Sequence, residues 1–581
     1  MSEPVENSNA DSEHVVEKSK SILPKKTIAW VGFLVLIIAV MRLGNSWLDD
    51  QFGIGLDYIN VATYLVGLVI LASLFIHFLF FSKFSVGLRV ASLILLVGLP
   101  AFVKFVLRPV PNGDIGIARF EPIWESKSKA GPQMKEVDSD PESLANVDLS
   151  IENDFDFPRF LGGNQNAWVE NPLALAPSRF SNAEEVWKQP IGLGWSGFAV
   201  RNNYAVTMEQ RDEMECVTCY DVITGNLKWK YEHAARHLDK MRAGGIGPRS
   251  TPTIDNGFVY AMGALGNFVC LKGSTGELVW QVDMNDLLGI ELIEDFTDGS
   301  GLKVQYESNT SLAWGRAGSP LIVDDKVVVA GGGPKTEDTT PTTLIAFDKK
   351  TGEVIWRGGE EGIAYGSPTL VNVSTVRQIM IVAESLAMGF DPETGELLWE
   401  HPRAGESGSA ANCSQVTVVS DNYILTSKSY NDGGGELIAL EIEKGKLVPK
   451  SIWTSTRVLK TKLNNPIIVD GHSYAISNGF LECVDLADGA RIWKHGKRMK
   501  HGQILKSGNY LLVHSEEGRL HLVDPTPEGY RELGAFNTVD GVCWNTFSLY
   551  GPYLLVRSEL EAACFKLPIE GDSQASQGKI F

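Results

Sequence analysis

Residues 385–399 read Ser-Leu-Ala-Met-Gly-Phe-Asp-Pro-Glu-Thr-Gly-Glu-Leu-Leu-Trp: a short apolar run ends at Asp391, a Thr-Gly pair follows, and Trp399 closes the stretch. Five such stretches occur in the chain, each with a tryptophan four residues after the glycine of a Thr-Gly or Asp-Gly pair. The glycine–tryptophan pairs are Gly225/Trp229, Gly276/Trp280, Gly352/Trp356, Gly395/Trp399 and Gly489/Trp493. The apolar run leads into Asp221, Asp348, Asp391 and Asp485 in four copies and into Lys272 in the other. A recurring pattern of this kind indicates an array of similar structural units.

Each unit is expected to be a four-stranded antiparallel sheet. Around Asp391, strand-length runs rich in branched and aromatic residues cover 366–371, 378–383, 385–391 and 394–399. The Asp-x-x-Thr-Gly segment predicts a tight turn, in which the aspartate accepts backbone N–H groups and the glycine adopts a positive φ. Four short strands in a unit of about 40–50 residues are typical of a propeller blade. The tryptophan is then expected to pack between neighbouring blades.

The number of blades follows from the turns after the third strands. Seven complete units have this turn at Asp221, Lys272, Asp348, Asp391, Glu441, Asp485 and Asp524. An eighth third strand, 562–567, has no fourth strand after it, and we expect 185–190, with Trp187, to supply that strand and remove an exposed edge. The sequence therefore predicts an all-β, eight-bladed β-propeller over 157–568 with a composite last blade. Units five and seven lack the tryptophan, and Trp453 is the candidate to replace it in the fifth.

The N-terminal region predicts a bundle of about three transmembrane helices. Apolar stretches place them at about 28–44, 61–81 and 86–107, within a transmembrane region of 27–108. Lysines precede the first span and the next loop is acidic, so residues 1–26 are expected to be a cytoplasmic tail and the propeller to lie outside. Lys104 and Arg108 follow the third span on its outer side and argue against this orientation. A cleaved signal peptide is not expected, because the apolar run starts late and no small-x-small site follows it. Residues 109–156 read as a Pro-rich acidic linker, and 569–581 as a disordered tail.

Charge and cysteine placement exclude several functions. A net charge of −19 disfavours nucleic acid as a partner, since phosphate binding needs clustered cations. Four of the seven cysteines stand two residues before the Asp-equivalent position, where a small buried residue is expected; they are Cys219, Cys270, Cys483 and Cys564. Cys216 and Cys219 are three residues apart and are expected on opposite faces of one strand, which disfavours a disulfide or metal site. No catalytic residue and no metal-binding set is predicted.

The blade motif, apolar-Asp-x-x-Thr-Gly-x-x-x-Trp, resembles the repeat of the pyrroloquinoline-quinone-type (PQQ-like) eight-bladed propellers over roughly 157–567. That superfamily contains quinoprotein alcohol and glucose dehydrogenases and an outer-membrane assembly lipoprotein. Residues 157–163, Phe-Pro-Arg-Phe-Leu-Gly-Gly, resemble the Trp-Pro-x-x-Arg-Gly opening of related bacterial proteins, with Leu161 in place of the arginine. The resemblance implies a bacterial inner-membrane protein with its propeller on the extracytoplasmic side. In the quinone enzymes a calcium-bound quinone lies on the axis, often under a ring formed by two adjacent cysteines, and this sequence has no Cys-Cys pair.

Candidate ligand-binding residues precede the first strand of each blade, where the connecting loops open onto the axis. They are Arg249, Ser250, Trp314, Arg316, Tyr365, Asn412, Lys462, Asn464, His501 and Trp544, with Ser319, Ser367 and Asn545 beside them. The three cations among them favour an anion such as a carboxylate or quinone. The alternative is that these side chains satisfy hydrogen bonds between blades. His237 is expected to be a solvated residue in a short helix, and the insertion near 283–313 is either a lid over the channel or an edge decoration.

Two functions follow as hypotheses. The favoured one is a membrane-anchored, extracytoplasmic, non-catalytic module that binds a protein or polymer partner. The alternative is a membrane-bound dehydrogenase of alcohols or sugars that uses PQQ and calcium. In the second case the axial loops should provide an acidic calcium ligand and an aromatic floor, with Trp314 or Trp544 as the candidates for that floor.

Overall fold

The computed structural model describes residues 24–52, 54–81, 84–111, 117–122, 136, 147–239, 244–297, 302–308, 310, 312–403, 405, 411–430 and 433–571. The chain forms two compact units, an N-terminal helical unit and a C-terminal β unit, which meet in sequence at Phe105 and Val106. The expected tails fall almost entirely outside the described residues, which begin at Pro24 and end at Gly571.

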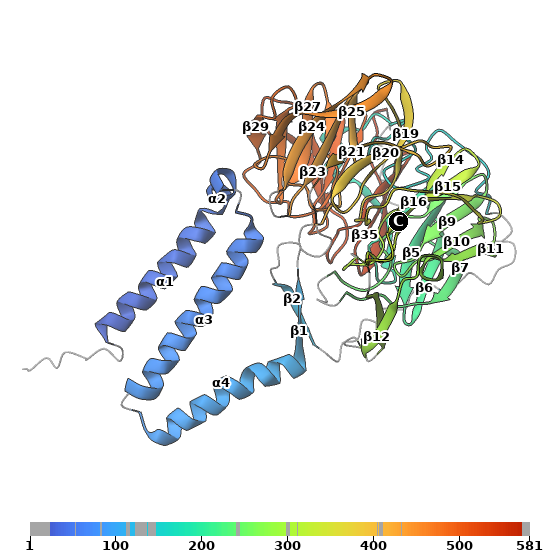
Figure 1. Ribbon diagram of the computed structural model, residues 1–581. Helices are drawn as coiled ribbons and strands as arrows, with labels where there is room; N and C mark the ends of the chain where they lie inside the picture. The colour runs from blue at the N-terminus through green and yellow to red at the C-terminus, as the bar shows by residue number, and fades with distance from the viewer. Residues whose placement is uncertain are drawn as a thin grey trace, which may run out of the picture. The chain divides into compact units, whose positions relative to one another are not determined.

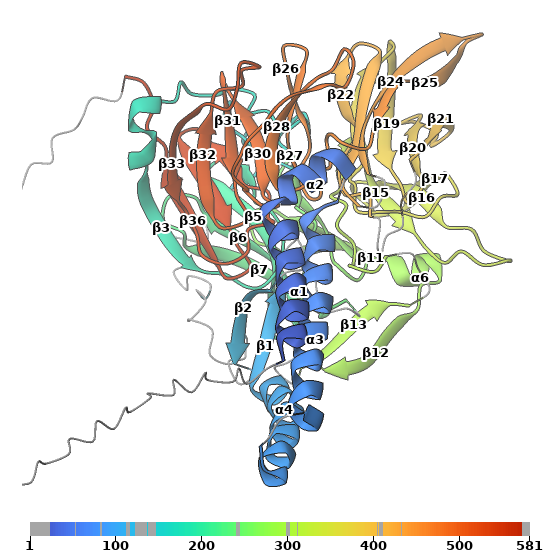
Figure 2. The same ribbon diagram turned by 90° about the vertical axis from the view of Figure 1, so that its left-hand side faces the viewer.

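The helical unit contains α1 (Lys25–Leu43), α2 (Asn45–Phe52), α3 (Leu56–Phe81) and α4 (Val86–Val106). Helices α1 and α3 run side by side (Figures 1 and 2). By length and composition, these two helices are apolar enough to cross a membrane. The expected count of three spans is not confirmed, because in α4 only the shorter stretch Val86–Leu95 stands out as apolar among the described residues. The acidic loop between the first two spans includes the additional helix α2.

The β unit is the predicted eight-bladed propeller, built from eight four-stranded antiparallel sheets. Blade 1 has β4 (Ala199–Arg201), β5 (Tyr204–Arg211), β6 (Met214–Asp221) and β7 (Leu227–Ala234). Blade 2 has β8 (Thr253–Asp255), β9 (Phe258–Met262), β10 (Asn267–Lys272) and β11 (Leu278–Asp283). Blade 3 has β14 (Leu321–Val323), β15 (Lys326–Gly332), β16 (Thr342–Asp348) and β17 (Val354–Gly358). Blade 4 has β18 (Thr369–Val373), β19 (Val376–Val382), β20 (Leu386–Phe390) and β21 (Leu397–Pro402).

The remaining blades complete the circle. Blade 5 has β22 (Thr417–Ser420), β23 (Tyr423–Lys428), β24 (Gly434–Glu443) and β25 (Lys446–Ser455). Blade 6 has β26 (Ile467–Val469), β27 (His472–Ser477), β28 (Phe480–Asp485) and β29 (Arg491–Lys494). Blade 7 has β30 (Gln503–Ser507), β31 (Tyr510–His514), β32 (Arg519–Val523) and β33 (Glu532–Asn537). Blade 8 has β34 (Ser548–Tyr550), β35 (Tyr553–Arg557), β36 (Glu561–Lys566) and β3 (Glu184–Pro190). First strands of neighbouring blades touch, so they surround the axis.

The composite eighth blade is confirmed. Strand β3, which precedes blade 1 in sequence, pairs antiparallel with β36 (Figure 2), and in this register Trp187 lies opposite Cys564. The short 3₁₀ helix η1 (Pro177–Asn182) leads into β3 and packs on β33 of blade 7. The two ends of the propeller therefore share one sheet, and this pairing closes the ring.

The turns after the third strands have the predicted geometry. Asp391 Oδ1 accepts the backbone N–H groups of Glu393 at 2.9 Å and Thr394 at 2.8 Å. Gly395 adopts a φ of 72°, a left-handed conformation that costs glycine little. Asp221 and Asp348 make the same pair of hydrogen bonds in their blades.

Tryptophans join one blade to the next. Each indole N–H donates to the carbonyl of the turn in the following blade; these pairs are Trp187–Val222, Trp229–Gly273, Trp280–Lys349, Trp356–Pro392, Trp453–Leu486 and Trp493–Thr526. Five of these rings also cover the turn glycine, so that a Cβ there would come within 3 Å of the ring. Trp453 does replace the missing tryptophan of the fifth unit, because its ring covers Gly489. Trp399 is the exception, since its indole donates to Gln378 in its own blade.

The cysteines fill the core as expected. Cys219, Cys270 and Cys483 each pair across the sheet with the tryptophan of their own blade. All seven cysteines are free thiols, and burial raises the pKa of Cys270 and Cys564 to about 12. Cys216 and Cys219 form no disulfide, in keeping with their placement on one strand.

Two further parts of the β unit lie outside the blades. Strand β1 (Leu107–Pro111), which begins two residues before the segment expected to be a linker, pairs with β2 (Ile117–Pro122) inside that segment. Val147 and Leu149 are buried in the core of blades 1 and 2, so packing on the propeller begins ahead of residue 157. Between blades 2 and 3 the insertion contains α6 (Met284–Leu288) and a hairpin of β12 (Leu292–Thr297) and β13 (Lys303–Glu307).

Candidate functional site

The loops that enter the first strand of each blade are joined by a circle of hydrogen bonds, which we call the axial ring. In blades 2 to 6 it consists of the residue two positions before the first strand: Thr251, Ser319, Ser367, Gln415 and Asn465. Each of these side chains accepts the backbone N–H of the equivalent residue in the preceding blade, at 2.8–3.1 Å. The same bond is made by the hydroxyl of threonine or serine and by the carboxamide of glutamine or asparagine, because each of these side chains has an oxygen acceptor.

The axial ring closes through blades 7 and 8. The Gln503 amide donates to the carbonyls of Leu463 and Trp544, both at 2.8 Å, and so links blades 6 and 8 through blade 7. The Asn545 amide donates to the Ser196 carbonyl at 2.8 Å and links blade 8 to blade 1. These polar side chains are buried. Buried polar groups need such partners, so the inner ends of the blades are tied into one frame.

Most of the predicted candidates are held by the protein itself. Arg316 is buried and pairs with Glu307 at 2.9 Å, and its guanidinium also donates to the Gly331 carbonyl at 2.6 Å. Arg249 donates to the carbonyls of Gly247 and Gly244 in its own loop. Burial lowers the pKa of Arg249 to about 10, and the nearby Asp239 carboxylate opposes this shift.

The other polar candidates also contact the blades and loops around them. The Asn412 amide donates to three backbone carbonyls, and Asn464 exchanges two hydrogen bonds with the backbone of Ile476. The Lys462 ammonium lies 5.3 Å from the centre of the Tyr430 ring. Ser250 and His501 are fully buried. Hydrogen bonds between blades, the alternative given above, are thus made by Asn412 and Tyr365. Arg249, Arg316 and Asn464 bond instead within their own loop or blade or to the insertion.

The loops that enter the first strands converge at one end of the central channel, which we call the mouth. The aromatic candidates form a row around part of this mouth, and we call it the aromatic row. The rings of Trp544 and Trp195 lie 4.6 Å apart, and the Trp195 indole donates to the Gly244 carbonyl at 2.6 Å. Gly244 packs against the Trp314 ring, and the backbone N–H of Trp314 donates to the Tyr365 hydroxyl at 3.1 Å. The row crosses the loops that enter blades 8, 1, 2, 3 and 4. Sequence reasoning missed Trp195, which stands in the same loop position as Trp544 and was identifiable by that alignment.

Buried charges behind the mouth were also missed. Glu209 accepts hydrogen bonds from the Tyr220 hydroxyl at 2.7 Å and from the Arg211 guanidinium at 3.0 Å. Arg557 of blade 8 donates to Thr207 and Met208 of blade 1. Burial opposes ionisation of Glu209, but the guanidinium groups of Arg211 and Arg557 hold its pKa below the ordinary value. This network joins the last blade to the first.

The acidic side chains at the mouth each accept a hydrogen bond from the protein. Glu215 accepts the Ala264 N–H at 3.0 Å, Asp239 accepts the Gly244 N–H at 2.9 Å, and Glu516 accepts the Trp544 indole N–H at 3.1 Å. Across the described ranges, no three His, Cys, Asp or Glu side chains come together as a metal-binding group. A calcium-bound quinone needs acidic oxygens that converge on the axis. No such group of acids occurs among the described mouth residues.

His237 corrects one expectation. It is 1% exposed and lies in extended chain just after β7, where it forms a bridge with Gln305 of the insertion, so it is neither helical nor solvated. Burial lowers its pKa to about 3, and the charge of Arg249 adds to the effect. Because Gln305 and Glu307 of the insertion contact His237 and Arg316, the described base of the insertion forms part of the mouth wall.

Glu215 predicts a pH-dependent stability. Burial raises its pKa to about 7, against an ordinary value of 4.5. The stability that this group contributes is therefore fully present below pH 4.5 and is lost as pH rises through 7. We expect Glu215→Gln to stabilise the protein at pH 8 by about 2 kcal/mol and to have little effect at pH 5. Denaturant unfolding at both pH values measures this. Glu213→Gln, at an exposed position in the same hairpin, is the control, and an equal gain at both pH values would contradict the prediction.

The fold and the axial ring define an eight-bladed propeller of closed, four-stranded blades with a polar frame at its axis. The sequence profile of a family described as "Outer membrane protein assembly factor BamB" matches residues 178–527. The chain belongs to this family, which confirms the resemblance to PQQ-like propellers.

Solved structures share the fold at low sequence identity. The quinohemoprotein alcohol dehydrogenase from Comamonas testosteroni is 13% identical, with 75% of this chain and 86% of that chain covered and a TM-score of 0.51. A europium-containing methanol dehydrogenase is 12% identical, with 72% and 99% covered and a TM-score of 0.52. BamB from Moraxella catarrhalis is 14% identical, with 66% and 98% covered and a TM-score of 0.43. None of the curated proteins matches the chain.

Proposed function

We propose that this protein is a membrane-anchored, non-catalytic propeller that binds a protein partner on the extracytoplasmic side of a bacterial inner membrane. The observation that carries the proposal is the axial ring: side chains that would otherwise face a ligand on the axis hold the blades together. The acids of the mouth are bound to backbone N–H groups, an indole or an arginine. A closed, rigid frame of this kind suits a binding scaffold.

The anchoring part of the proposal rests on the helical unit. Helices α1 and α3 are long and apolar enough to cross a bilayer, and Lys25 and Lys26 begin α1. Lysines before a first span favour a cytoplasmic N-terminus. The family description, an outer membrane protein assembly factor, supports a protein as the partner and an extracytoplasmic place of action.

The aromatic row favours a second candidate function, a dehydrogenase that uses PQQ and calcium. The Trp195 and Trp544 rings are only partly buried and lie together at the mouth with their planes tilted by 38°, where they offer aromatic surface to a planar ring system. Arg249 lies in the adjacent loop, although its donors are used by backbone carbonyls. Under this alternative the substrate would be an alcohol or a sugar.

One experiment separates the two functions. The full chain, purified in detergent, is incubated with PQQ and Ca²⁺, and its thermal unfolding and its dye reduction over a panel of alcohols and sugars are measured. We expect no thermal shift and no turnover. A stabilisation by several degrees together with turnover would overturn the scaffold function. Trp195→Ala is the matched variant, because it removes part of the aromatic row and should abolish any such shift.

The orientation gives a separate prediction. Because the native cysteines are almost all buried, a single introduced thiol at Lys350→Cys, in an exposed turn of blade 3, reports the side on which the propeller lies. A membrane-impermeant maleimide should label this variant in spheroplasts with intact inner membranes, and wild type should label weakly. Labelling only after the membrane is broken would place the propeller in the cytoplasm.

A further inference from the structure

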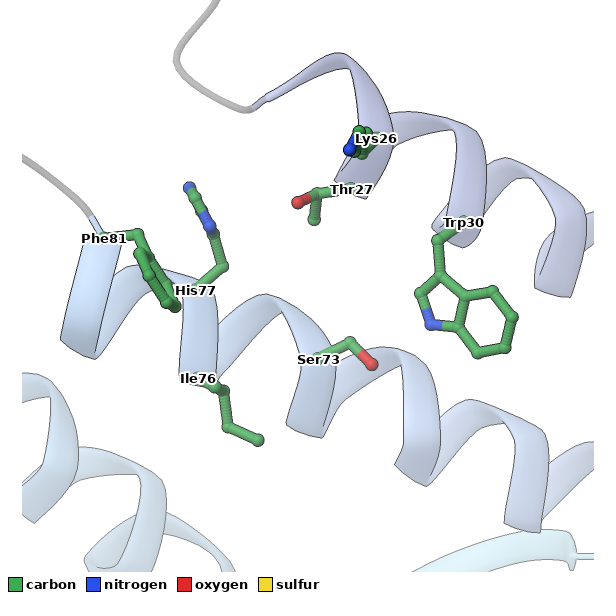
Figure 3. Close-up of a pocket in the computed structure, with 7 residues that line it drawn as sticks. All are labelled: Lys26, Thr27, Trp30, Ser73, Ile76, His77 and Phe81. Carbon is green, nitrogen blue, oxygen red and sulfur yellow. The ribbon is translucent and has the colours of Figure 1, made fainter.

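A small cavity lies within the helical unit, between the start of α1 and the end of α3. Its volume is about 290 Å³, and it is lined by Lys26, Thr27, Trp30, Ser73, Ile76, His77 and Phe81 (Figure 3). Since α1 and α3 run in opposite directions, the beginning of one and the end of the other lie at the same level. If these helices cross the membrane as proposed, the cavity lies at one surface of the bilayer.

His77 is the feature that distinguishes this cavity. It is a polar residue in an otherwise strongly apolar end of α3, and only 8% of it is exposed. Its ring stacks on Phe81, with ring centres 5.7 Å apart. Within the described part of the chain, its nitrogens have no hydrogen-bond partner. Figure 3 shows the side chain extending from α3 toward the first turn of α1. An ionisable residue inside an apolar span calls for a partner, and no protein group there supplies one.

The first turn of α1 places the positive end of its helix dipole at this cavity. Helix α1 is 19 residues long, its N-cap residue Pro24 makes no side-chain cap, and its first turn contains no acidic residue. Among the described residues no side-chain cap or acid takes up its first backbone N–H groups, so these groups and the positive end of the helix dipole can receive an anion. Lys26 adds an ammonium group at the cavity. The Ser73 hydroxyl already donates to the Val69 carbonyl at 2.7 Å and contributes only to the wall.

The other walls of the cavity are apolar. Trp30, Ile76 and Phe81 border it, and Trp30 is about half exposed, as expected of an aromatic side chain at a membrane interface. The Lys26 ammonium and the first N–H groups of α1 lie beside an apolar wall. This combination fits a phosphodiester group with hydrocarbon attached.

We infer that this cavity binds the headgroup phosphate of an anionic glycerophospholipid, with His77 and Lys26 as donors and the acyl chains along Trp30 and Ile76. The inference rests on the proposed membrane anchoring. The bound lipid would join α1 to α3 at the end of the helical unit where α1 begins.

Lipid retention by the full chain tests the inference. The protein is purified in a non-ionic detergent and incubated with equal amounts of phosphatidylglycerol and phosphatidylcholine, and bound lipid is measured by native mass spectrometry. We expect phosphatidylglycerol to be retained preferentially. His77→Leu and Lys26→Gln should each reduce its retention about tenfold, because each removes a hydrogen bond to a charged group. His77→Gln keeps a donor and should retain more lipid than His77→Leu.

Lys25→Gln is the matched control, since Lys25 is adjacent, carries the same charge and does not line the cavity. It should change retention at most about twofold. Equal losses in the Lys25 and Lys26 variants, or no preference between the two lipids, would overturn the inference. Displacement of lipid by millimolar inorganic phosphate would show that free phosphate is the ligand and would also overturn it. Carbonate extraction of membranes tests the anchoring separately, and unchanged unfolding of the propeller excludes misfolded variants.

Discussion

Arg557→Met is expected to lower the free energy of unfolding by about 3 kcal/mol or more, which is the largest effect of a single substitution that we predict. Arg557 is 1% exposed and donates to the Thr207 hydroxyl at 3.0 Å, the Met208 carbonyl at 2.9 Å and the Gly192 carbonyl at 2.8 Å. Its removal leaves these acceptors without a donor at the junction of the last blade with the first. It also removes one of the two cations that stabilise ionised Glu209.

Arg377→Met is the control for this prediction. Arg377 also lies on the second strand of a blade and makes a bidentate pair with Asp324, but both side chains are well exposed. Water replaces such a pair, so a loss below about 1 kcal/mol is expected. Denaturant unfolding followed by tryptophan fluorescence measures both variants. Similar losses in the two would show that burial at the blade 8–blade 1 junction has no special importance.

Gly395→Ala is expected to cost about 2–4 kcal/mol of stability, because it combines backbone strain with a steric clash. Gly395 has a φ of 72°, and a Cβ at this position would lie 2.5 Å from Cε3 of Trp356 in the preceding blade. The indole would have to move, and its hydrogen bond to the Pro392 carbonyl would be lost.

Gly445→Ala isolates the backbone part of that cost. Gly445 occupies the corresponding turn of blade 5 with a φ of 79°, but nothing lies within 4 Å of a Cβ placed there. Only strain remains, about 1 kcal/mol. The same unfolding measurement compares the two alanine variants. Equal losses would mean that the tryptophan–glycine contact does not stabilise the blade interface.

The sequence predicted the blades because their determinants are local. Asp391, Gly395 and Trp399 lie within nine residues, and each acts through the turn or the adjacent strand. Even the composite blade was predictable, since a third strand at 562–567 without a fourth requires a partner and Trp187 marked it. Cys219 and its equivalents were placed correctly for the same reason.

The mouth was harder to predict because its contacts join residues far apart in sequence. The axial ring uses Thr251, Gln415 and Asn465 at one structural position, and these side chains have only an oxygen acceptor in common. No residue-type motif identifies such a position, although counting back from each first strand would have found it. His237 was misassigned because Ala-Ala-Arg favours a helix locally, while the bridge to Gln305 holds the chain extended.

The pairing of β3 with β36 has a consequence for the order in which the protein matures. A ribosome makes β3 some 370 residues before β36, as the difference between Pro190 and Glu561 shows. Throughout that interval β3 has an unsatisfied edge that other chains can join. A chain that ends after blade 7 would keep this edge permanently. We therefore expect nascent and truncated forms to depend on chaperones far more than the folded protein does. In the folded protein β36, the last strand of the propeller to be made, covers the edge of β3, the first.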